Sequence, residues 1–183
     1  MQVVYGGSFN PPTLAHLAII EYLATRYEKL IVIPNGKLYV KNGLIDFNHR
    51  IEMLKIITNR FDNIEISYIE TERNFLGTFQ SLRELGHPLF ACGDDCLEQF
   101  HSWINPEALL TENKFLIFTR NFEVDVIYDR IKNNSLLAPY FNKFTVVKLD
   151  LPNVSSSNFR KTYDKNQLDS EVYEYIVKNN LYK

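Results

Sequence analysis

Hydrophobic and polar positions follow two recurring patterns along this chain. In the segment Leu14–Tyr27, apolar residues at Leu17, Ile20 and Leu23 have the three-residue spacing that lines one face of a helix. The run Leu30–Ile33 is short, apolar and closed by a Pro-Asn-Gly turn, which is typical of a buried strand. Both patterns return in alternation to the end of the sequence, so we predict strands and helices that alternate.

The predicted strands are residues 2–5, Leu30–Ile33, Ile64–Ile69, Pro88–Cys92, Lys114–Thr119 and Phe144–Leu149. The predicted helices are Leu14–Tyr27, Phe47–Phe61, Thr78–Leu85, Cys96–Trp103, Val124–Asn133, Ser155–Asp164 and Ser170–Asn179, and residues 37–46 are expected to form an irregular loop. This alternation favours an α/β fold, a Rossmann-like, doubly wound parallel sheet with helices on both faces and right-handed crossovers. We see no linker or internal repeat, and therefore predict a single domain over residues 1–183.

Bulk composition excludes several classes of function. The chain has 183 residues, of which 45% are hydrophobic, and it contains 13 Phe and 11 Tyr, enough to fill a core. A net charge of −2 gives no electrostatic reason to expect nucleic acid or an anionic membrane as a partner. No apolar run approaches the length of a membrane span and no signal peptide is visible. Cys92 and Cys96 lack zinc-site spacing, so we expect reduced thiols in a cytoplasmic protein.

The start of the chain carries the most specific signal. A β-branched run leads into Gly6 and Gly7, an Asn-Pro-Pro turn follows, and an apolar helix then begins with His16 in its first turns. Glycine lets a backbone approach a ligand closely, and a helix N-terminus offers unpaired N–H groups to phosphate. His16 adds a donor that can become cationic as charge develops on a phosphoryl group. An ordinary turn with a surface histidine is the alternative, and it explains a lone glycine pair better than this dense cluster.

Neither a P-loop nor the G-x-G-x-x-G dinucleotide fingerprint is present. Instead, Gly6–His16 resembles the signature of the nucleotidyltransferases with a His-x-Gly-His motif. Phe9 and Asn10 fall where that family has its adenosine-binding pair, and His16 falls on the second histidine. Thr13 replaces the first histidine and an alanine replaces the glycine, as in the Thr-x-x-His variant of nicotinamide-mononucleotide adenylyltransferases. A threonine hydroxyl can donate to phosphate, but it cannot carry charge.

Four later segments resemble the nicotinate-nucleotide adenylyltransferase family in the right order. They are Arg50-x-x-Met53-Leu54, Gly93-x-Asp95-x-Leu97-x-x-Phe100-x-x-Trp103, Ser155-Ser156-Ser157-x-x-Arg160 and the closing segment 172–182. The resemblance implies transfer of AMP from ATP to nicotinate mononucleotide, with deamido-NAD and pyrophosphate as products. It implies Mg²⁺ that accompanies ATP, no metal held by the protein alone, and in-line attack with no covalent intermediate.

The resemblance also assigns residues to roles. The catalytic residues would be His16, Thr13 and Arg160. The ATP-binding residues would be Gly7, Ser8, Phe9, Asn10, His16, Gly93, Asp95, Ser155, Ser156, Ser157 and Arg160. The mononucleotide-binding residues would be Lys41, Thr78 and Trp103, with Lys37 a competing assignment for Lys41. We add Arg120 to this group because it follows a predicted strand and could meet a substrate anion there. Serine hydroxyls and a forked guanidinium at a helix start suit phosphate oxygens, and a flat indole suits a pyridine ring.

Simpler explanations remain for several of these residues. The serines could be only a helix cap beside a solvated Arg160, Asp95 only another cap, Trp103 a core residue and Arg120 a surface cation. For the whole chain, the alternatives are an adenylyltransferase that uses the amide mononucleotide or both forms, another superfamily member with a phosphopantetheine or amino-acid-like acceptor, and a non-catalytic nucleotide sensor. The sequence leaves the oligomeric state open, a homo-oligomer included.

Overall fold

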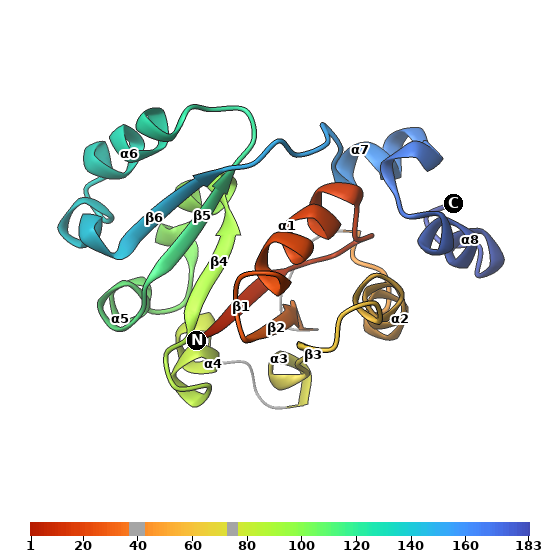
Figure 1. The fold of residues 1–183 in the computed structure, drawn as a ribbon, viewed down its shortest axis with the longest axis horizontal. Coiled ribbons are helices and arrows are strands. Elements are labelled where there is room, and N and C mark those ends of the chain that lie inside the picture. The colour runs from red at the N-terminus through yellow and green to blue at the C-terminus, as the bar shows by residue number, and fades with distance from the viewer. Residues whose placement is uncertain (37–42, 73–76) are drawn as a thin grey trace.

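The computed structural model describes residues 1–36, 43–72 and 77–183 (Figure 1). Its strands form one six-stranded sheet in the order β3-β2-β1-β4-β5-β6, and every neighbouring pair is parallel. The strands are β1 (Gln2–Gly7), β2 (Lys29–Pro34), β3 (Ile64–Ile66), β4 (Leu89–Gly93), β5 (Phe115–Thr119) and β6 (Phe144–Lys148). The predicted fold class, a Rossmann-like doubly wound sheet, is therefore confirmed. The strand order reverses between β1 and β4, which is where such sheets open a crevice for ligands.

Eight α-helices lie within the described residues. They are α1 (Leu14–Ala24), α2 (Phe47–Thr58), α3 (Ile69–Glu72), α4 (Thr78–Glu84), α5 (Pro106–Glu112), α6 (Val124–Asn133), α7 (Ser156–Thr162) and α8 (Ser170–Lys178). Four 3₁₀ segments join them, namely η1 (Asp94–Glu98), η2 (Phe100–Ser102), η3 (Ala138–Lys143) and η4 (Lys165–Gln167). None of these described helices is long and apolar enough to cross a membrane.

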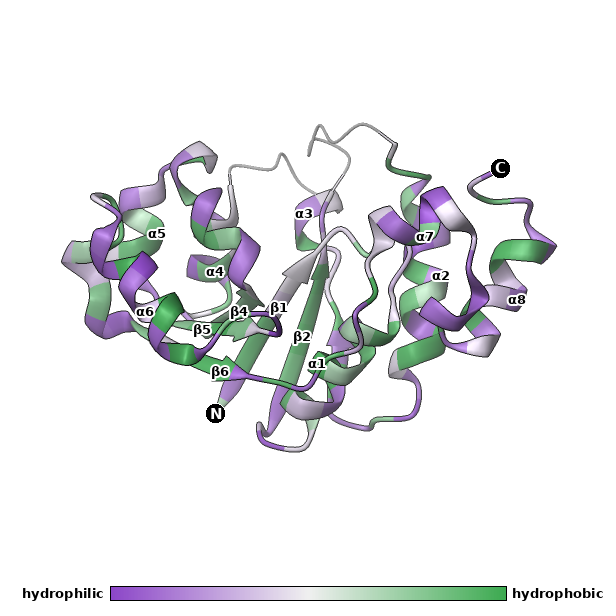
Figure 2. Ribbon diagram, turned by 90° about the horizontal axis from the view of Figure 1, so that it is seen from above, coloured by the Kyte–Doolittle hydropathy of each residue, from purple (hydrophilic) through white to green (hydrophobic). Residues whose placement is uncertain are grey.

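Two apolar layers hold the helices to the sheet. Alternate residues of β1 point to opposite faces, so Val3 and Tyr5 enter one layer and Val4 enters the other. The first layer packs α1, α2, α7 and α8 against the sheet, and the second packs α4, α5 and α6. Figure 2 shows these two groups of helices on either side of the strands. Because helices cover both faces of the sheet, side chains on both sides of the central strands are buried, and the sequences of these strands are continuous apolar runs.

Two predicted elements differ from the structure in type or extent. The expected helix Cys96–Trp103 is two 3₁₀ segments, because a three-residue repeat places Leu97, Phe100 and Trp103 on the same inward side. The expected strand Ile64–Ile69 ends at Ile66, where its pairing with β2 stops, and α3 begins at Ile69.

One helix has no counterpart among the predicted elements. α5 begins at Pro106 after Asn105, whose side chain accepts from the N–H of Ala108. An Asn cap followed by proline at the first helical position is a known start signal, so the sequence contained the information. The longer predicted helices end early, α1 at Ala24 and α2 at Thr58, since hydrogen-bonded turns take over from there.

A buried arginine ties together the ends of two neighbouring strands. Arg50 on α2 is 2% exposed, and its Nη1 and Nη2 donate to the backbone oxygens of Ser8 and Asn35, each at 2.9 Å. Ser8 follows β1 and Asn35 follows β2. Asn35 Nδ2 also donates to Ser8 Oγ at 3.3 Å. The forked guanidinium is suited to this task because it reaches two acceptors at once.

We predict that Arg50→Lys lowers the free energy of unfolding by roughly 1.5–3 kcal/mol, the range for a hydrogen bond from a charged group, because an ammonium cannot hold both carbonyl oxygens. Arg60→Lys is the matched control, since Arg60 is largely exposed and pairs with Asp169 at the surface. That change should cost at most about 1 kcal/mol. Denaturant unfolding of both variants measures the difference, and equal losses would show that Arg50 is not a clamp.

Candidate active site

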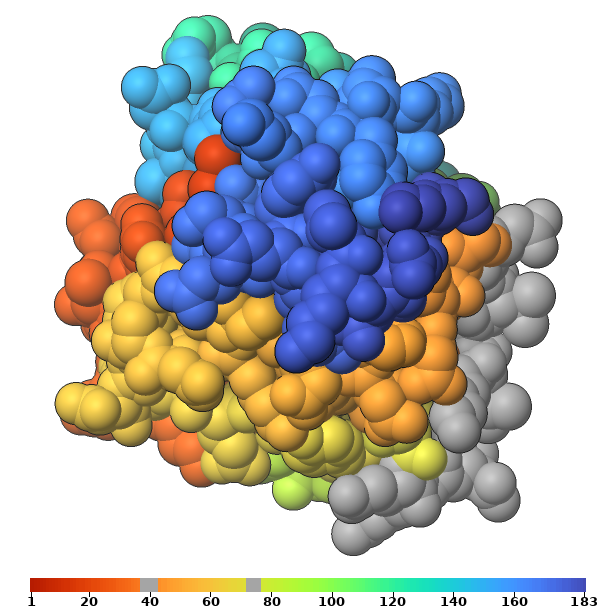
Figure 3. All heavy atoms as spheres, turned by 90° about the vertical axis from the view of Figure 1, so that its right-hand side faces the viewer, coloured from red at the N-terminus to blue at the C-terminus, as the bar shows by residue number. Residues whose placement is uncertain are grey.

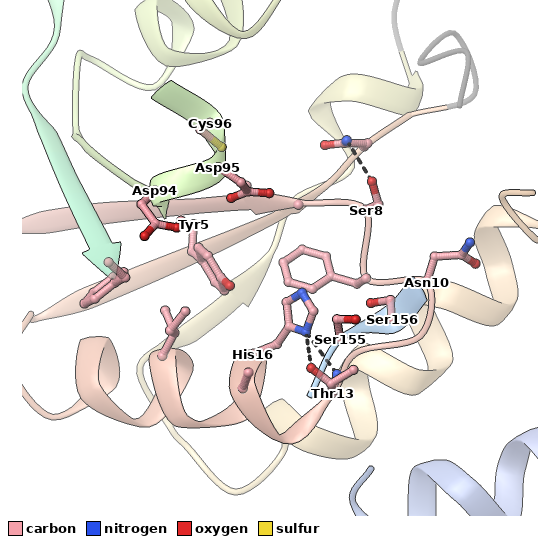
Figure 4. A pocket seen from close by; sticks show the side chains of 18 of the residues that line it. Tyr5, Ser8, Asn10, Thr13, His16, Asp94, Asp95, Cys96, Ser155 and Ser156 are labelled. Atoms are coloured by element: carbon pink, nitrogen blue, oxygen red, sulfur yellow. Dashed lines mark hydrogen bonds between the residues drawn. The ribbon is translucent and has the colours of Figure 1, made fainter. Parts of the chain in front are cut away.

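A cavity of about 490 Å³ opens at the carboxyl ends of the strands, where the strand order reverses (Figure 4). All predicted site residues that the structure describes line it: Gly7, Ser8, Phe9, Asn10, Thr13, His16, Thr78, Gly93, Asp95, Trp103, Arg120, Ser155, Ser156, Ser157 and Arg160. Lys41 and its competitor Lys37 lie outside the described residues. The fold thus gathers side chains from positions 7 to 160 around one space, and their individual roles remain predictions.

The orientation of His16 is set by the start of its own helix. Its Nδ1 accepts from the backbone N–H of Thr13 at 3.0 Å and lies 2.8 Å from Thr13 Oγ1. An amide N–H can only donate, so Nδ1 must carry a lone pair and the ring proton sits on Nε2. Figure 4 shows the imidazole held by Thr13 on one edge with its other nitrogen turned away from that residue. The helix start therefore leaves Nε2–H as the donor available to a ligand.

The electrostatic environment keeps this imidazole neutral. Burial, and then the positive charge of Arg120, lower the pKa of His16 to about 4. In the protein without ligand the geometry favours the same neutral form, because protonation of Nδ1 would break its bond to the Thr13 N–H. That the ring becomes cationic as charge develops on a phosphoryl group stays a prediction. Thr13 is 2% exposed and its hydroxyl lies against the ring, so in this structure Thr13 orients His16.

The serine run begins helix α7 and attaches it to the first loop. Ser155 caps the helix by accepting from the N–H of Asn158 at 3.1 Å, and Ser156 Oγ donates to the backbone oxygen of Pro11 at 2.8 Å. Arg160 Nη1 donates to the backbone oxygen of Asn10 at 2.7 Å, and its Nη2 lies 3.4 Å from Ser157 Oγ. The serine run therefore caps the helix and lines the cavity at the same time.

Arg120 and Asn10 are partly committed to the scaffold. Arg120 follows β5 and donates from Nη1 to the backbone oxygen of Val154 at 2.7 Å, next to the serine run. Asn10 is 2% exposed, and its side-chain amide donates to the backbone oxygen of Gly43 and accepts from Ile45 N–H. A guanidinium has five N–H donors, so Arg120 keeps some for a ligand. The Asn10 side chain, by contrast, holds protein segments together.

The loop after β4 brings acidic groups to the same cavity. A Cβ atom at Gly93 would lie 2.6 Å from Asp95 Oδ1, so the carboxylate of Asp95 folds back over the glycine. Asp94 Oδ2 is buried without a hydrogen-bond partner among the described residues. Burial raises the pKa of Tyr5, and the nearby Asp95 adds to that rise. Cys92 is buried and Cys96 half-buried, both as free thiols, and a hydrogen bond to Cys96, followed by burial, raises the pKa of Cys92.

Trp103 belongs to both the core and the cavity. Its ring packs against Phe100 at 4.9 Å between centroids and edge-on against Phe90 at 6.0 Å. It also lines the cavity, and its Nε1 is buried with no hydrogen-bond partner in the described part of the chain. Aromatic packing fixes the ring and leaves an indole N–H unsatisfied, which is what a site for a planar polar ligand requires.

The sequence analysis assigned no individual role to two residues near the site, Arg50 and Glu70. Arg50 occurs in a family motif, but nothing in a single sequence separates a buried clamp from an exposed helix arginine. Glu70 on α3 is 5% exposed, lines the cavity and accepts from the Gly36 N–H and the Ser81 hydroxyl. Burial raises the pKa of Glu70 to about 7. A Cβ at Gly36 would lie 2.0 Å from the backbone oxygen of Glu70, so only glycine fits there.

The sheet order, the glycine loop at its reversal and the serine-arginine helix start together define a nucleotidyltransferase type of fold. The chain belongs to the cytidylyltransferase-like family, whose model matches residues 4–162. It is 35% identical over 192 residues to a protein of Acholeplasma laidlawii named probable nicotinate-nucleotide adenylyltransferase, with 100% of this chain and 98% of the relative covered. A Clostridium tetani protein of the same name is 28% identical, with the same coverage.

Solved structures show the same fold. A Plasmodium falciparum nicotinic acid mononucleotide adenylyltransferase complexed with NaAD has a TM-score of 0.78 and 24% identity, and the match covers 99% of this chain and 96% of that one. The same protein complexed with APC has a TM-score of 0.77, with equal identity and coverage. The predicted resemblance to this family is therefore confirmed over the full length of the chain.

We predict that His16→Ala lowers turnover by about two to four powers of ten, the scale for loss of a donor that stabilises developing charge. The fold should survive because His16 is at a helix start and is only partly buried. His101→Ala is the control, since His101 is exposed and is not part of the cavity lining. Steady-state rates and thermal unfolding of the wild type and the two variants test this prediction. Near-wild-type turnover in His16→Ala would remove His16 from the mechanism.

The same geometry predicts the protonation state. Because the folded pKa of His16 is about 4, its ring should stay neutral, with the proton on Nε2, from about pH 5.5 to 8 in the protein without ligand. Nitrogen chemical shifts of the ring measure this directly. A proton taken up near the pKa of free imidazole would contradict the assignment.

Proposed function

We propose that this protein transfers AMP from ATP to nicotinate mononucleotide, with deamido-NAD and pyrophosphate as products. A phosphate oxygen of the mononucleotide attacks the α-phosphorus of ATP, a new P–O bond forms, and the bond from that phosphorus to the pyrophosphate oxygen breaks. The reaction needs no covalent enzyme intermediate, so catalysis consists of positioning and charge stabilisation. Full-length relatives that carry this name support the proposal.

One observation carries the chemistry. The cavity at the strand reversal is lined by a fixed N–H donor, His16 Nε2, together with two guanidinium groups, Arg120 and Arg160, and the serine run 155–157. Donors held in place before the ligand arrives stabilise phosphoryl charge without reorganisation. We assign His16 to the α-phosphate that is attacked, and Arg160 with the serines to the departing pyrophosphate.

Magnesium fits this scheme as part of the ATP complex. Among the described residues, no group of three or more His, Cys, Asp and Glu side chains is placed to hold a metal ion. Mg²⁺ prefers to keep waters and to bind phosphate oxygens with few protein ligands, so it would enter on the triphosphate and neutralise part of its charge. Asp94, a residue of the cavity wall, has a buried carboxylate oxygen, Oδ2, without a hydrogen-bond partner among the described residues, and it would suit a water of that ion.

The acceptor nucleotide would occupy the part of the cavity near Trp103, Thr78 and Arg120. A pyridine ring can stack on or lie against the fixed indole of Trp103, more strongly if the ring is cationic. Thr78 is the first residue of α4 and lines the cavity, so the N-terminal N–H groups of that helix lie on this side. Backbone N–H groups can donate to a carboxylate and are mispaired with the NH₂ group of an amide.

The decisive experiment is a pyrophosphate-release assay with ATP and either the acid or the amide mononucleotide. We predict that the acid is preferred by roughly tenfold or more in specificity constant, the scale of one mispaired polar contact. Trp103→Ala should weaken both mononucleotides by a similar factor, because stacking does not distinguish the two. Equal specificity constants would overturn the choice of substrate but leave adenylyl transfer standing. No pyrophosphate with either acceptor would favour a non-catalytic nucleotide sensor.

We also predict that Arg160→Ala raises the KM for ATP more than the KM for the mononucleotide, because its guanidinium is assigned to the pyrophosphate end. Arg160→Lys should rescue this only in part, since the planar fork is lost. Initial rates with each substrate varied in turn separate the two constants. Unchanged ATP kinetics in Arg160→Ala would remove the serine-arginine helix from the proposed ATP site.

A further inference from the structure

The last residues of the chain return to the loop that follows β1. Beyond α8 the backbone adopts left-handed φ angles of 53° at Asn180 and 62° at Tyr182. The Tyr182 hydroxyl then donates to Oδ1 of Asn10 at 2.9 Å, across 172 residues of sequence. In Figure 3 the dark blue C-terminal residues lie against lighter blue atoms of the α7 region and against the orange segment that leads into α2.

Asn10 is the junction that receives this hydroxyl. Its side-chain amide donates to the backbone oxygen of Gly43 at 2.8 Å, and Oδ1 accepts from the N–H of Ile45 at 3.3 Å. Its backbone oxygen accepts from Arg160 Nη1 at 2.7 Å. At 2% exposure, Asn10 cannot exchange these partners for water. The bond from Ile45 is long, so Oδ1 depends mainly on the Tyr182 hydroxyl.

The same tail also contacts the helix that carries Arg160. The Tyr182 ring meets the Phe159 ring edge-on at 6.0 Å between centroids. Next to it, the Tyr163 hydroxyl donates to the backbone oxygen of Leu181 at 3.1 Å. Phe159 is fully buried, so these contacts hold the tail in one place. The tail thus touches both groups that Arg160 joins, its own helix and the loop containing Asn10.

We propose that Tyr182 is a positioning residue for the ATP half of the site, acting through Asn10 on Arg160. The proposal rests on the proposed adenylyl transfer. Tyr182 is absent from the cavity lining, so it would not touch ATP itself. Its hydroxyl would fix the rotation of the Asn10 side chain, which in turn fixes the backbone oxygen that holds the Arg160 guanidinium.

The proposal predicts that loss of the Tyr182 hydroxyl weakens the binding of ATP and leaves the binding of the mononucleotide nearly unchanged. Without the hydroxyl, Asn10 Oδ1 would retain one long hydrogen bond, and the loop carrying the acceptor oxygen of Arg160 could shift. Among the described residues, no hydrogen bond or ring contact joins this tail to Trp103 or Thr78, which lie on the proposed mononucleotide side. A structural support for the whole domain would instead lower stability and affect both substrates alike.

The test is Tyr182→Phe, which keeps the ring and removes the hydroxyl. Calorimetric titration with ATP alone should show binding weakened by roughly three- to tenfold, the effect of one lost hydrogen bond to a buried group. The KM for ATP should rise by a similar factor, and the KM for nicotinate mononucleotide should stay within about twofold.

The matched control is Tyr175→Phe. Tyr175 is on α8, and its hydroxyl lies 2.8 Å from His49 Nδ1, so the control removes the same group from a different contact of the C-terminal region. It should leave ATP binding unchanged even if it lowers the unfolding temperature. In an Arg160→Ala background, adding Tyr182→Phe should weaken ATP binding much less than it does alone, since the two residues act in series.

Unchanged ATP affinity in Tyr182→Phe would overturn the inference, and so would an equal loss in Tyr175→Phe. If the losses of ATP binding caused by Tyr182→Phe and Arg160→Ala simply add in the double variant, Tyr182 does not act through Arg160. That result would also overturn the inference. If the wild-type protein binds ATP but releases no pyrophosphate, the proposed function fails while the binding comparison still decides the inference. A wild-type protein that binds no ATP overturns both.

Discussion

The site depends on a buried arginine whose guanidinium is held by backbone carbonyl groups. Burial removes Arg50 from water, which lowers its pKa, and its guanidinium donates to the backbone oxygens of Ser8 and Asn35. Carbonyl dipoles at the ends of β1 and β2 thus accept the hydrogen bonds of this charge, and the nearby Asp46 adds an electrostatic attraction. These hydrogen bonds hold the two strand ends together, so the glycine loop before His16 is supported from below and the cavity is formed by the protein's own contacts.

Much of this arrangement could be predicted from the sequence because local rules and global fold agree. The apolar runs gave the strands and the alternation gave the parallel sheet, and the glycines with His16 marked the loop at the strand reversal. The mistakes lie where tertiary packing decides. Leu97, Phe100 and Trp103 fit an α-helical or a 3₁₀ repeat equally well until the core that they enter is known.

The contacts that sequence reasoning missed join residues far apart along the chain. Asn10 matches the family motif for adenosine binding, but its side chain is engaged by Gly43, Ile45 and Tyr182. Glu70 is an acid in a polar stretch, and only the fold buries it against Gly36. No local pattern records such contacts, so a single sequence can locate the site and its chemistry but cannot separate the groups that meet a ligand from those that hold them.

The replacement of the motif's first histidine by Thr13 alters how the site obtains its positive charge. Since the Thr13 N–H occupies Nδ1, His16 contributes a dipole, and the described cations that line the cavity are the guanidiniums of Arg120 and Arg160. A guanidinium keeps its charge at every pH at which proteins stay folded. The attraction that these two guanidiniums exert on a triphosphate is therefore the same in acidified and in alkaline cells, and among the described residues of the cavity the charge that changes near neutral pH is that of Glu70, whose pKa burial raises to about 7.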